Sequence, residues 1–163
     1  MYLIDGNNVI GKRLTESESS SDRLRLIGEV SDFARKFGNR CAIIFDGTPE
    51  ATIQDGSKRQ GVTILYARPG RDADHRIIEL IERERNRQAL RVITSDSQLA
   101  AKARAYGVKV ISRDEFRQKL REAGSNDGKS EKPSFSKGDM SEWFRYFGVD
   151  EDDDGNEYEF EDE

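Results

Sequence analysis

Short apolar runs alternate with amphipathic stretches through residues 1–122, and this order constrains the fold more than any other feature. The runs have the length of β-strands, and several are apolar at every position, as strands covered on both faces are. Between them, apolar residues recur at the i, i+3, i+4 spacing of helices with one buried face. The expected strands are Tyr2–Ile4, Cys41–Phe45, Val62–Tyr66, Leu90–Ile93 and Val108–Ile111, and the expected helices lie within 19–37, 73–87, 97–106 and 113–122.

This alternation predicts an α/β fold with a mostly parallel central sheet that helices cover on both faces. The helix within 19–37 is expected to begin at the Ser19–Asp22 capping signal. Its buried stripe is expected to include Leu24, Ile27, Val30, Phe33 and Phe37. The polar segment between Asp46 and Val62 has no clear period and is expected to be a loop or a short irregular element.

Aspartates follow three of the expected strands within a few residues. Asp5 follows the first strand, Asp46 the second and Asp96 the fourth, while Asp72 and Asp74 open the helix after the third. The carboxyl ends of neighbouring parallel strands line one crevice, so these side chains should meet there. Clustered carboxylates repel one another unless a cation joins them. Carboxylate oxygens suit Mg²⁺ or Mn²⁺, and the chemistry that such a site serves is metal-assisted phosphodiester hydrolysis.

Each aspartate also has a purely structural explanation. Asp5-Gly6 and Asp46-Gly47 are turn signals, and Asp72, Asp74 or Asp96 would suit the first turn of a helix. It is their joint placement at strand ends that favours a site.

Four segments resemble the motifs of NYN domains, particularly the YacP-like group of the PIN-like nuclease superfamily. They are Tyr2–Gly11 (YLIDGNNVIG), Ile43–Gly47 (IIFDG), Arg71–Ile78 (RDADHRII) and Val92–Ser97 (VITSDS), in the family's order. The resemblance implies a PIN-like domain, a Rossmann-like three-layer α/β sandwich with a mostly parallel central sheet. It also implies metal-dependent endoribonuclease activity on single-stranded RNA. Members of such groups act in RNA processing and mRNA decay, some of them in association with ribosomes.

The resemblance also implies which residues form the site. The metal-binding and catalytic carboxylates would be Asp5, Asp46, Asp74 and Asp96, with Asn8, Thr94 and Ser95 as additional polar groups. Family patterns have one acidic residue at the third motif, whereas this chain has Asp72 and Asp74. We favour Asp74, because it directly precedes the apolar stripe of the expected helix, and keep Asp72 as an additional candidate.

Basic residues near the expected crevice are candidates for binding RNA phosphates. They are Lys12, Arg13, Lys58, Arg59, Arg68, Arg71 and Arg76, and the alternative for each is an ordinary solvated charge. His75 lies beside Asp74, but a metal-activated water needs no histidine as its base. Tyr66 is a candidate for base stacking, although core packing explains it more simply.

The chain's charge divides sharply by position. Asp150–Glu163 holds ten acidic residues and no Lys or Arg, whereas residues 1–149 hold 27 basic and 22 acidic residues. We therefore expect a nuclease domain at 1–122, a flexible linker at 123–138 and an aromatic, then acidic, disordered tail at 139–163. The tail could be solubilising, could compete with RNA for the crevice, or could bind a basic protein partner.

Composition narrows the remaining classes. One cysteine excludes an internal disulfide and a cysteine-based zinc site, and no apolar run is long enough for a membrane helix. We expect a cytoplasmic protein without a signal peptide and without a membrane partner. The alternative to an enzyme is a non-catalytic RNA- or ribosome-binding module on the same fold. A phospho-receiver domain is disfavoured, because Asp5 has no adjacent acid and Lys109 lies inside its strand.

Overall fold

The computed structural model describes residues 1–11 and 16–125, with side chains from Ser20 onward in the second range. Its elements belong to one compact unit, Met1–Lys132, and a second unit spans Pro133–Glu163. Lys12, Arg13, the expected tail and all but the first three residues of the expected linker lie outside the described residues.

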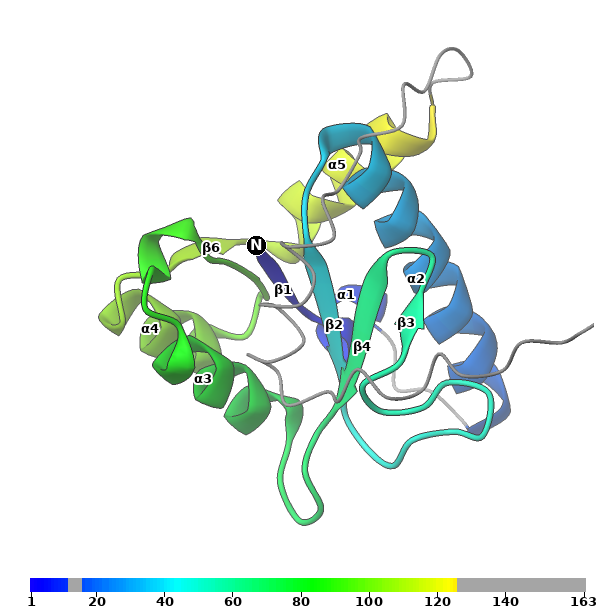
Figure 1. The fold of residues 1–163 in the computed structure, drawn as a ribbon, viewed down its shortest axis with the longest axis horizontal. Coiled ribbons are helices and arrows are strands. Elements are labelled where there is room, and N and C mark those ends of the chain that lie inside the picture. The colour runs from blue at the N-terminus through cyan, green and yellow to red at the C-terminus, as the bar shows by residue number, and fades with distance from the viewer. Residues whose placement is uncertain (12–15, 126–163) are drawn as a thin grey trace, which may run out of the picture. The chain divides into compact units, whose positions relative to one another are not determined.

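The described residues form a six-stranded sheet with helices on both faces (Figure 1). The strand order is β3-β4-β2-β1-β5-β6, and within this sheet only the β3–β4 pair is antiparallel. The predicted α/β class and mostly parallel sheet are therefore confirmed. The strands are β1 (Tyr2–Asp5), β2 (Cys41–Phe45), β3 (Lys58–Arg59), β4 (Val62–Tyr66), β5 (Arg91–Ile93) and β6 (Lys109–Ile111). The helices are α1 (Gly6–Ile10), α2 (Glu16–Phe37), α3 (Ala73–Arg83), α4 (Ser97–Ala105) and α5 (Arg113–Gly124), with a 3₁₀ turn, η1, at Arg87–Ala89.

The two faces of the sheet have different covers (Figure 1). Helices α1, α2 and α5 form one layer, and α3 and α4 form the other. Tyr2 faces the first layer, where its ring lies 5.2 Å from that of Phe33 on α2 and 6.4 Å from that of Phe116 on α5, centroid to centroid. Side chains alternate along a strand, so Leu3 and Asp5 face the α3–α4 layer. Asp5 therefore points toward the helix that carries Asp72 and Asp74.

Some sequence expectations about elements were wrong. Helix α2 begins at Glu16, upstream of the expected capping signal, and two members of its expected apolar stripe, Leu24 and Phe37, are 40% and 49% exposed. Leu26 is buried on that helix instead. Sequence reasoning also missed α1 and β3. Both are too short to show a hydrophobic period, since α1 has five residues and β3 two.

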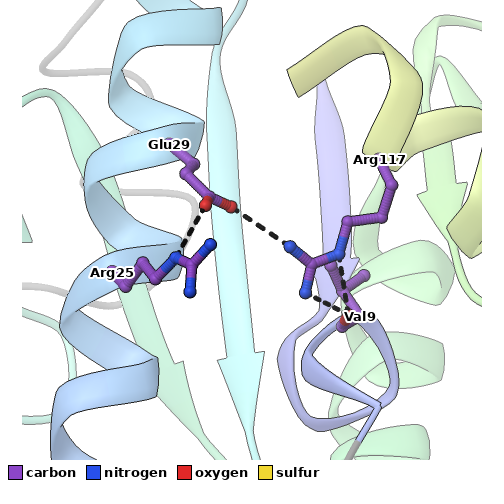
Figure 2. Close-up of polar contacts among 4 residues, drawn as sticks. All are labelled: Val9, Arg25, Glu29 and Arg117. Atoms are coloured by element: carbon purple, nitrogen blue, oxygen red, sulfur yellow. Dashed lines mark hydrogen bonds and ion pairs between the residues drawn. The ribbon is translucent and has the colours of Figure 1, made fainter. Parts of the chain in front are cut away.

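An arginine joins the three helices of the first layer (Figure 2). Arg117 on α5 donates from Nε and Nη2 to the carbonyl oxygen of Val9, at 3.2 and 2.8 Å. Its Nη1 lies 3.3 Å from Glu29 on α2, and Glu29 also pairs with Arg25 at 3.1 Å. This contact holds the C-terminal end of α1 against the larger helices. Among the described residues, no helix is long and apolar enough to cross a membrane.

Candidate active site

Asp5 is a nearly buried carboxylate at the end of the central strand β1. It is 5% exposed, and its Oδ2 accepts a 3.1 Å hydrogen bond from the hydroxyl of Thr94, which follows β5. Burial raises the pKa of Asp5 to about 7, with further raising from the negative charges of Asp74 and Asp46. The Thr94 hydroxyl opposes that shift in part. An acid of this kind is costly to ionise unless a cation shares its charge.

Asp46 follows β2 and is held from three sides. Its backbone N–H donates to Oδ1 of Asn7 at 3.2 Å, and its carbonyl oxygen accepts from Nη2 of Arg23 at 3.1 Å. Its own Oδ1 accepts from the backbone N–H of Ala73 at 2.7 Å, at the start of α3. Asp46 thus joins the end of β2 to the helix that carries Asp74.

The two acids of the third motif have different surroundings. Asp72 is the N-cap of α3 and accepts from the backbone N–H of His75 at 3.0 Å. Its Oδ1 also lies 2.5 Å from Nδ1 of His75, and more than half of each side chain is exposed. These bonds lower the pKa of Asp72. Asp74 instead has its pKa raised, by burial first and then by Asp72, Asp96 and Asp46, against the opposing charge of Lys102.

The turn after β5 connects the fourth motif to the first. Oδ1 of Asp96 caps α4 by accepting from the N–H groups of Gln98 and Leu99, at 2.9 and 2.8 Å. The Thr94 hydroxyl accepts from the N–H of Asp96 at 3.1 Å while it donates to Asp5. The N–H of Ser95 donates to Oδ1 of Asn8 at 2.8 Å. Asp96 therefore caps α4, and it also lies near enough to the other carboxylates to affect the pKa of Asp74.

Asn7 and Asn8 connect β1 to its two neighbours in opposite directions. Asn7 accepts from Asp46 after β2, and Asn8 accepts from Ser95 after β5. The side-chain Oδ1 atoms of Asn7 and Asn8 thus set the spacing between the ends of β1, β2 and β5. Sequence reasoning missed the contribution of Asn7, although the Asp-Gly-Asn-Asn run was a visible signal. It also missed Arg23, which is 8% exposed and stacks over Phe45 at 5.2 Å.

The carboxylates suit a hard cation in chemistry, but they are not gathered into a closed ligand set. Within the described part of the chain, no three Asp, Glu, His or Cys side chains form a group that could hold a metal ion. Asp5 and Asp74 nevertheless repel each other enough to raise the pKa of Asp5. Carboxylate oxygens are the ligands that Mg²⁺ and Mn²⁺ prefer, and a bound cation would relieve the repulsion between these acids.

The predicted basic residues do not all lie near the carboxylates. Lys58 and Arg59 form β3 and pair with Thr63 and Val62, at the amino end of β4. That end is opposite to the carboxylates, so the sequence-based placement of these two residues near the crevice was wrong.

The loop between β4 and α3 lies at the same edge of the sheet as the carboxylates. Arg71 is exposed there, and Arg68 is exposed but bonded through Nε to Glu79 at 2.9 Å. Arg76 is 7% exposed, with its Nη1 3.6 Å from Glu79, so it lies inside the fold. Tyr66 is 2% exposed and its ring packs against Phe45 in the core.

Arg113 is a basic residue that sequence reasoning missed. It begins α5 directly beyond the end of β6, and its N–H donates to the hydroxyl oxygen of Ser95 at 2.9 Å. Two features made it hard to find from sequence. It lies outside the four motifs, and its proximity to Ser95 depends on β6 pairing with β5.

Comparisons with known proteins agree with this architecture. The model of the YacP-like NYN domain family matches residues 2–143, which extends past the end expected for the domain. Two crystal structures of Rae1 (YacP) from Bacillus subtilis are similar in fold. The W164L mutant has a TM-score of 0.63 at 23% identity over 75% of each chain. The other has a TM-score of 0.59 at 23% identity, over 76% of this chain and 74% of that one. No significant match was found among curated protein sequences. The chain belongs to the YacP-like NYN domain family and has its nuclease-like α/β fold.

Proposed function

We propose that the protein is a metal-dependent endoribonuclease that hydrolyses phosphodiester bonds in single-stranded RNA. The observation that carries the proposal is the nearly buried Asp5, whose pKa burial and the charges of Asp74 and Asp46 raise to about 7. A binder of polyanions gains nothing from acids grouped in this way. A structural role alone would also leave the cost of ionising Asp5 without compensation.

Each residue then has a part in the reaction. Asp5 and Asp74 would hold Mg²⁺ or Mn²⁺, with Asp46 and Asp96 contributing the carboxylate oxygen that caps no helix N–H. Such a cation supplies Lewis acidity and lowers the pKa of a bound water. Thr94 orients the Asp5 carboxylate, while Asn8 and Ser95 hold the neighbouring turn. Asp72 is occupied with His75, which supports Asp74 as the carboxylate of the third motif.

The resemblance to YacP-like NYN domains supports a proposal for the substrate and setting. We propose RNA of the mRNA class as the substrate, the ribosome as a possible partner of the reaction, and the cytoplasm as the location. The single cysteine, Cys41, is a buried free thiol, which suits a reducing compartment.

A test of cleavage compares the full chain with single aspartate variants on end-labelled single-stranded RNA. With Mg²⁺ or Mn²⁺, the parent should produce internal cuts, and a chelator should abolish them. Asp5→Asn, Asp74→Asn and Asp96→Asn should each slow cleavage by roughly 100-fold or more, as loss of a preorganised electrostatic group does. Asp32→Asn is the matched control, since Asp32 pairs with Arg35 of the same helix, α2, and half of its side chain is exposed. Unchanged cleavage by Asp5→Asn would refute the site.

The second candidate is a non-catalytic RNA- or ribosome-binding module on the same fold. The observation in its favour is that no three metal-ligating side chains of the described residues form a closed group. This alternative predicts that the parent binds RNA but cuts none, with either cation and with ribosomes added. It also predicts equal RNA affinity with and without the chelator. Chelator-sensitive cleavage would exclude it.

A further inference from the structure

The carboxylates lie in the middle of one edge of the sheet, and arginines lie at both ends of that edge. Arg71 is in the loop after β4, Asp46 follows β2, Asp5 ends β1, and Arg113 follows β6. All five strands from β4 to β6 are parallel, so their carboxyl ends share this edge. With strands about 4.8 Å apart, the edge from β4 to β6 spans roughly 19 Å.

We propose that single-stranded RNA crosses this edge from Arg71 to Arg113, and that Arg113 binds a backbone phosphate. The inference rests on the proposed function and adds the path of the substrate to it. A row of acids repels a polyanion, so the backbone needs cationic contacts on both sides of the row. A span of this length holds several nucleotides, so only an RNA strand, and not a single phosphate, can contact both arginines.

The backbone of Arg113 is fixed relative to the carboxylates by consecutive hydrogen bonds. Its N–H donates to the Ser95 hydroxyl oxygen, and the Ser95 N–H donates to Oδ1 of Asn8, three residues after Asp5. The side chain extends over Gly11, where a Cβ would lie 2.9 Å from its Nη1. Gly11 has a φ of +76°, so glycine here serves both the left-handed turn after α1 and the passage of the guanidinium.

The guanidinium of Arg113 is available to a ligand in a way that neighbouring arginines are not. Its side chain is 39% exposed, and its ion pair is a 3.6 Å contact with Asp114, which is 89% exposed. Ion pairs on the surface contribute little and give way to a better partner. Arg117, one turn further along α5, is bonded to Val9 and Glu29 (Figure 2). Arg68 at the opposite end is bonded to Glu79.

A guanidinium suits this task because its planar donors match two phosphate oxygens and it stays charged at any physiological pH. The contact would be electrostatic and independent of base identity, so it should appear in the salt dependence of binding. Arg113 would be a substrate-positioning residue and would take no part in bond breaking.

The test measures fluorescence anisotropy of single-stranded RNA of increasing length, with chelator present so that no cleavage occurs. Arg113→Gln should weaken binding of long strands about three- to tenfold at low salt and reduce the salt slope by about 0.7. Arg121→Gln is the matched control, because it removes the same charge from an exposed position two turns further along α5. Arg113→Lys should recover most of the affinity. Strands too short to reach Arg113 should bind the parent and Arg113→Gln equally.

The proposed path would be wrong if Arg113→Gln bound long strands with the affinity and salt slope of the parent. It would also be wrong if Arg121→Gln lost as much RNA affinity as Arg113→Gln. The binding test does not depend on turnover, so the two proposals can fail separately. If the parent never cleaves RNA but Arg113→Gln still weakens its binding, the ribonuclease is wrong and the path stands. If cleavage requires Asp5 but Arg113→Gln binds RNA like the parent, the ribonuclease proposal stands and the proposed path is wrong. Under turnover, Arg113→Gln should raise KM by a larger factor than it lowers kcat.

Discussion

At the scale of single residues, Asp5 combines a buried position with a charge that its surroundings oppose. Its pKa is about 7 instead of the usual 3.8, so the folded state binds the Asp5 proton more tightly than the unfolded state does. The stability of the metal-free protein should therefore fall as pH rises between these values and stay low above them. The charges that face Asp5 are those of Asp74 at the start of α3 and Asp46 after β2.

Replacing Asp5 by Asn should reverse that loss. The Asn side chain keeps an oxygen that can accept the hydrogen bond from the Thr94 hydroxyl, but the side chain cannot ionise. In chelator, Asp5→Asn should match the parent near pH 4 and exceed its free energy of unfolding by up to roughly 4 kcal/mol above pH 7. Denaturant unfolding across this pH range measures the difference. A gap that does not widen with pH would contradict the prediction. Above pH 7, added Mn²⁺ should stabilise the parent more than the variant.

Asn7 tests whether the spacing of the strand ends matters for activity. Asn7→Ala removes the acceptor for the N–H of Asp46, which should cost about 1 kcal/mol of stability. Because Asp46 would then be less well placed, Mn²⁺ affinity and kcat should both fall, by about tenfold for a 1.4 kcal/mol loss of positioning. Calorimetric Mn²⁺ titration and cleavage rates measure the two effects. Asn86→Ala, at an exposed position before β5, is the control. A loss of stability with unchanged Mn²⁺ affinity would make Asn7 merely structural.

At the scale of elements, the turn from β1 into α1 depends on a missing side chain. A Cβ on Gly6 would lie 2.5 Å from the ring of Phe45 and 2.9 Å from Ile43, both fully buried on β2. The Phe45 ring cannot easily retreat, since it packs against Tyr66 and Arg23. This close approach of α1 to β2 brings Asn7 within reach of Asp46.

Two glycine-to-alanine changes should therefore have opposite effects. Gly6→Ala overfills the core and should lower the free energy of unfolding by about 1–3 kcal/mol. Gly28 lies inside α2, where an added Cβ meets nothing within 4 Å. Gly28→Ala should raise stability by about 0.5–1 kcal/mol, because alanine is the better helix former. Denaturant midpoints of the two variants would show this, and stabilisation by Gly6→Ala would contradict the close approach of α1 to β2.

The sequence predicted what depends on periodicity and missed what depends on the lateral order of strands. Strands buried on both faces are mostly apolar, so β2 and β4 were evident. An aspartate directly after a strand must lie at its carboxyl edge. The bonds of Asn7 to Asp46 and of Arg113 to Ser95 exist because β2 and β5 flank β1 and β6 adjoins β5. A single sequence does not specify that order. The sequence also did not predict that Arg76 is buried beside Glu79, because a charged residue on a helix is usually solvated.

At the scale of the whole molecule, the distribution of charge matters more than its total. The net charge of −5 combines −10 from Asp150–Glu163 with +5 from the remainder. The four proposed ligand aspartates are included in that +5, so the rest of residues 1–149 stands at +9. If the proposed function is correct, the basic remainder of the domain should attract RNA at long range, and an acidic segment in the same chain should compete with RNA at a high effective concentration.

Deleting residues 150–163 should therefore tighten RNA binding at low salt. The difference should shrink as salt is added, because screening shortens the reach of charge to about 8 Å at physiological ionic strength. Anisotropy of the deletion variant against the parent measures both effects. A second variant, with each acid of this segment replaced by its amide, keeps the length and removes the charge. If charge is the cause, this variant binds RNA like the deletion. If it binds like the parent while the deletion binds tighter, the segment obstructs RNA by its bulk. Equal affinity of all three would leave a solubilising segment or one that binds a basic protein.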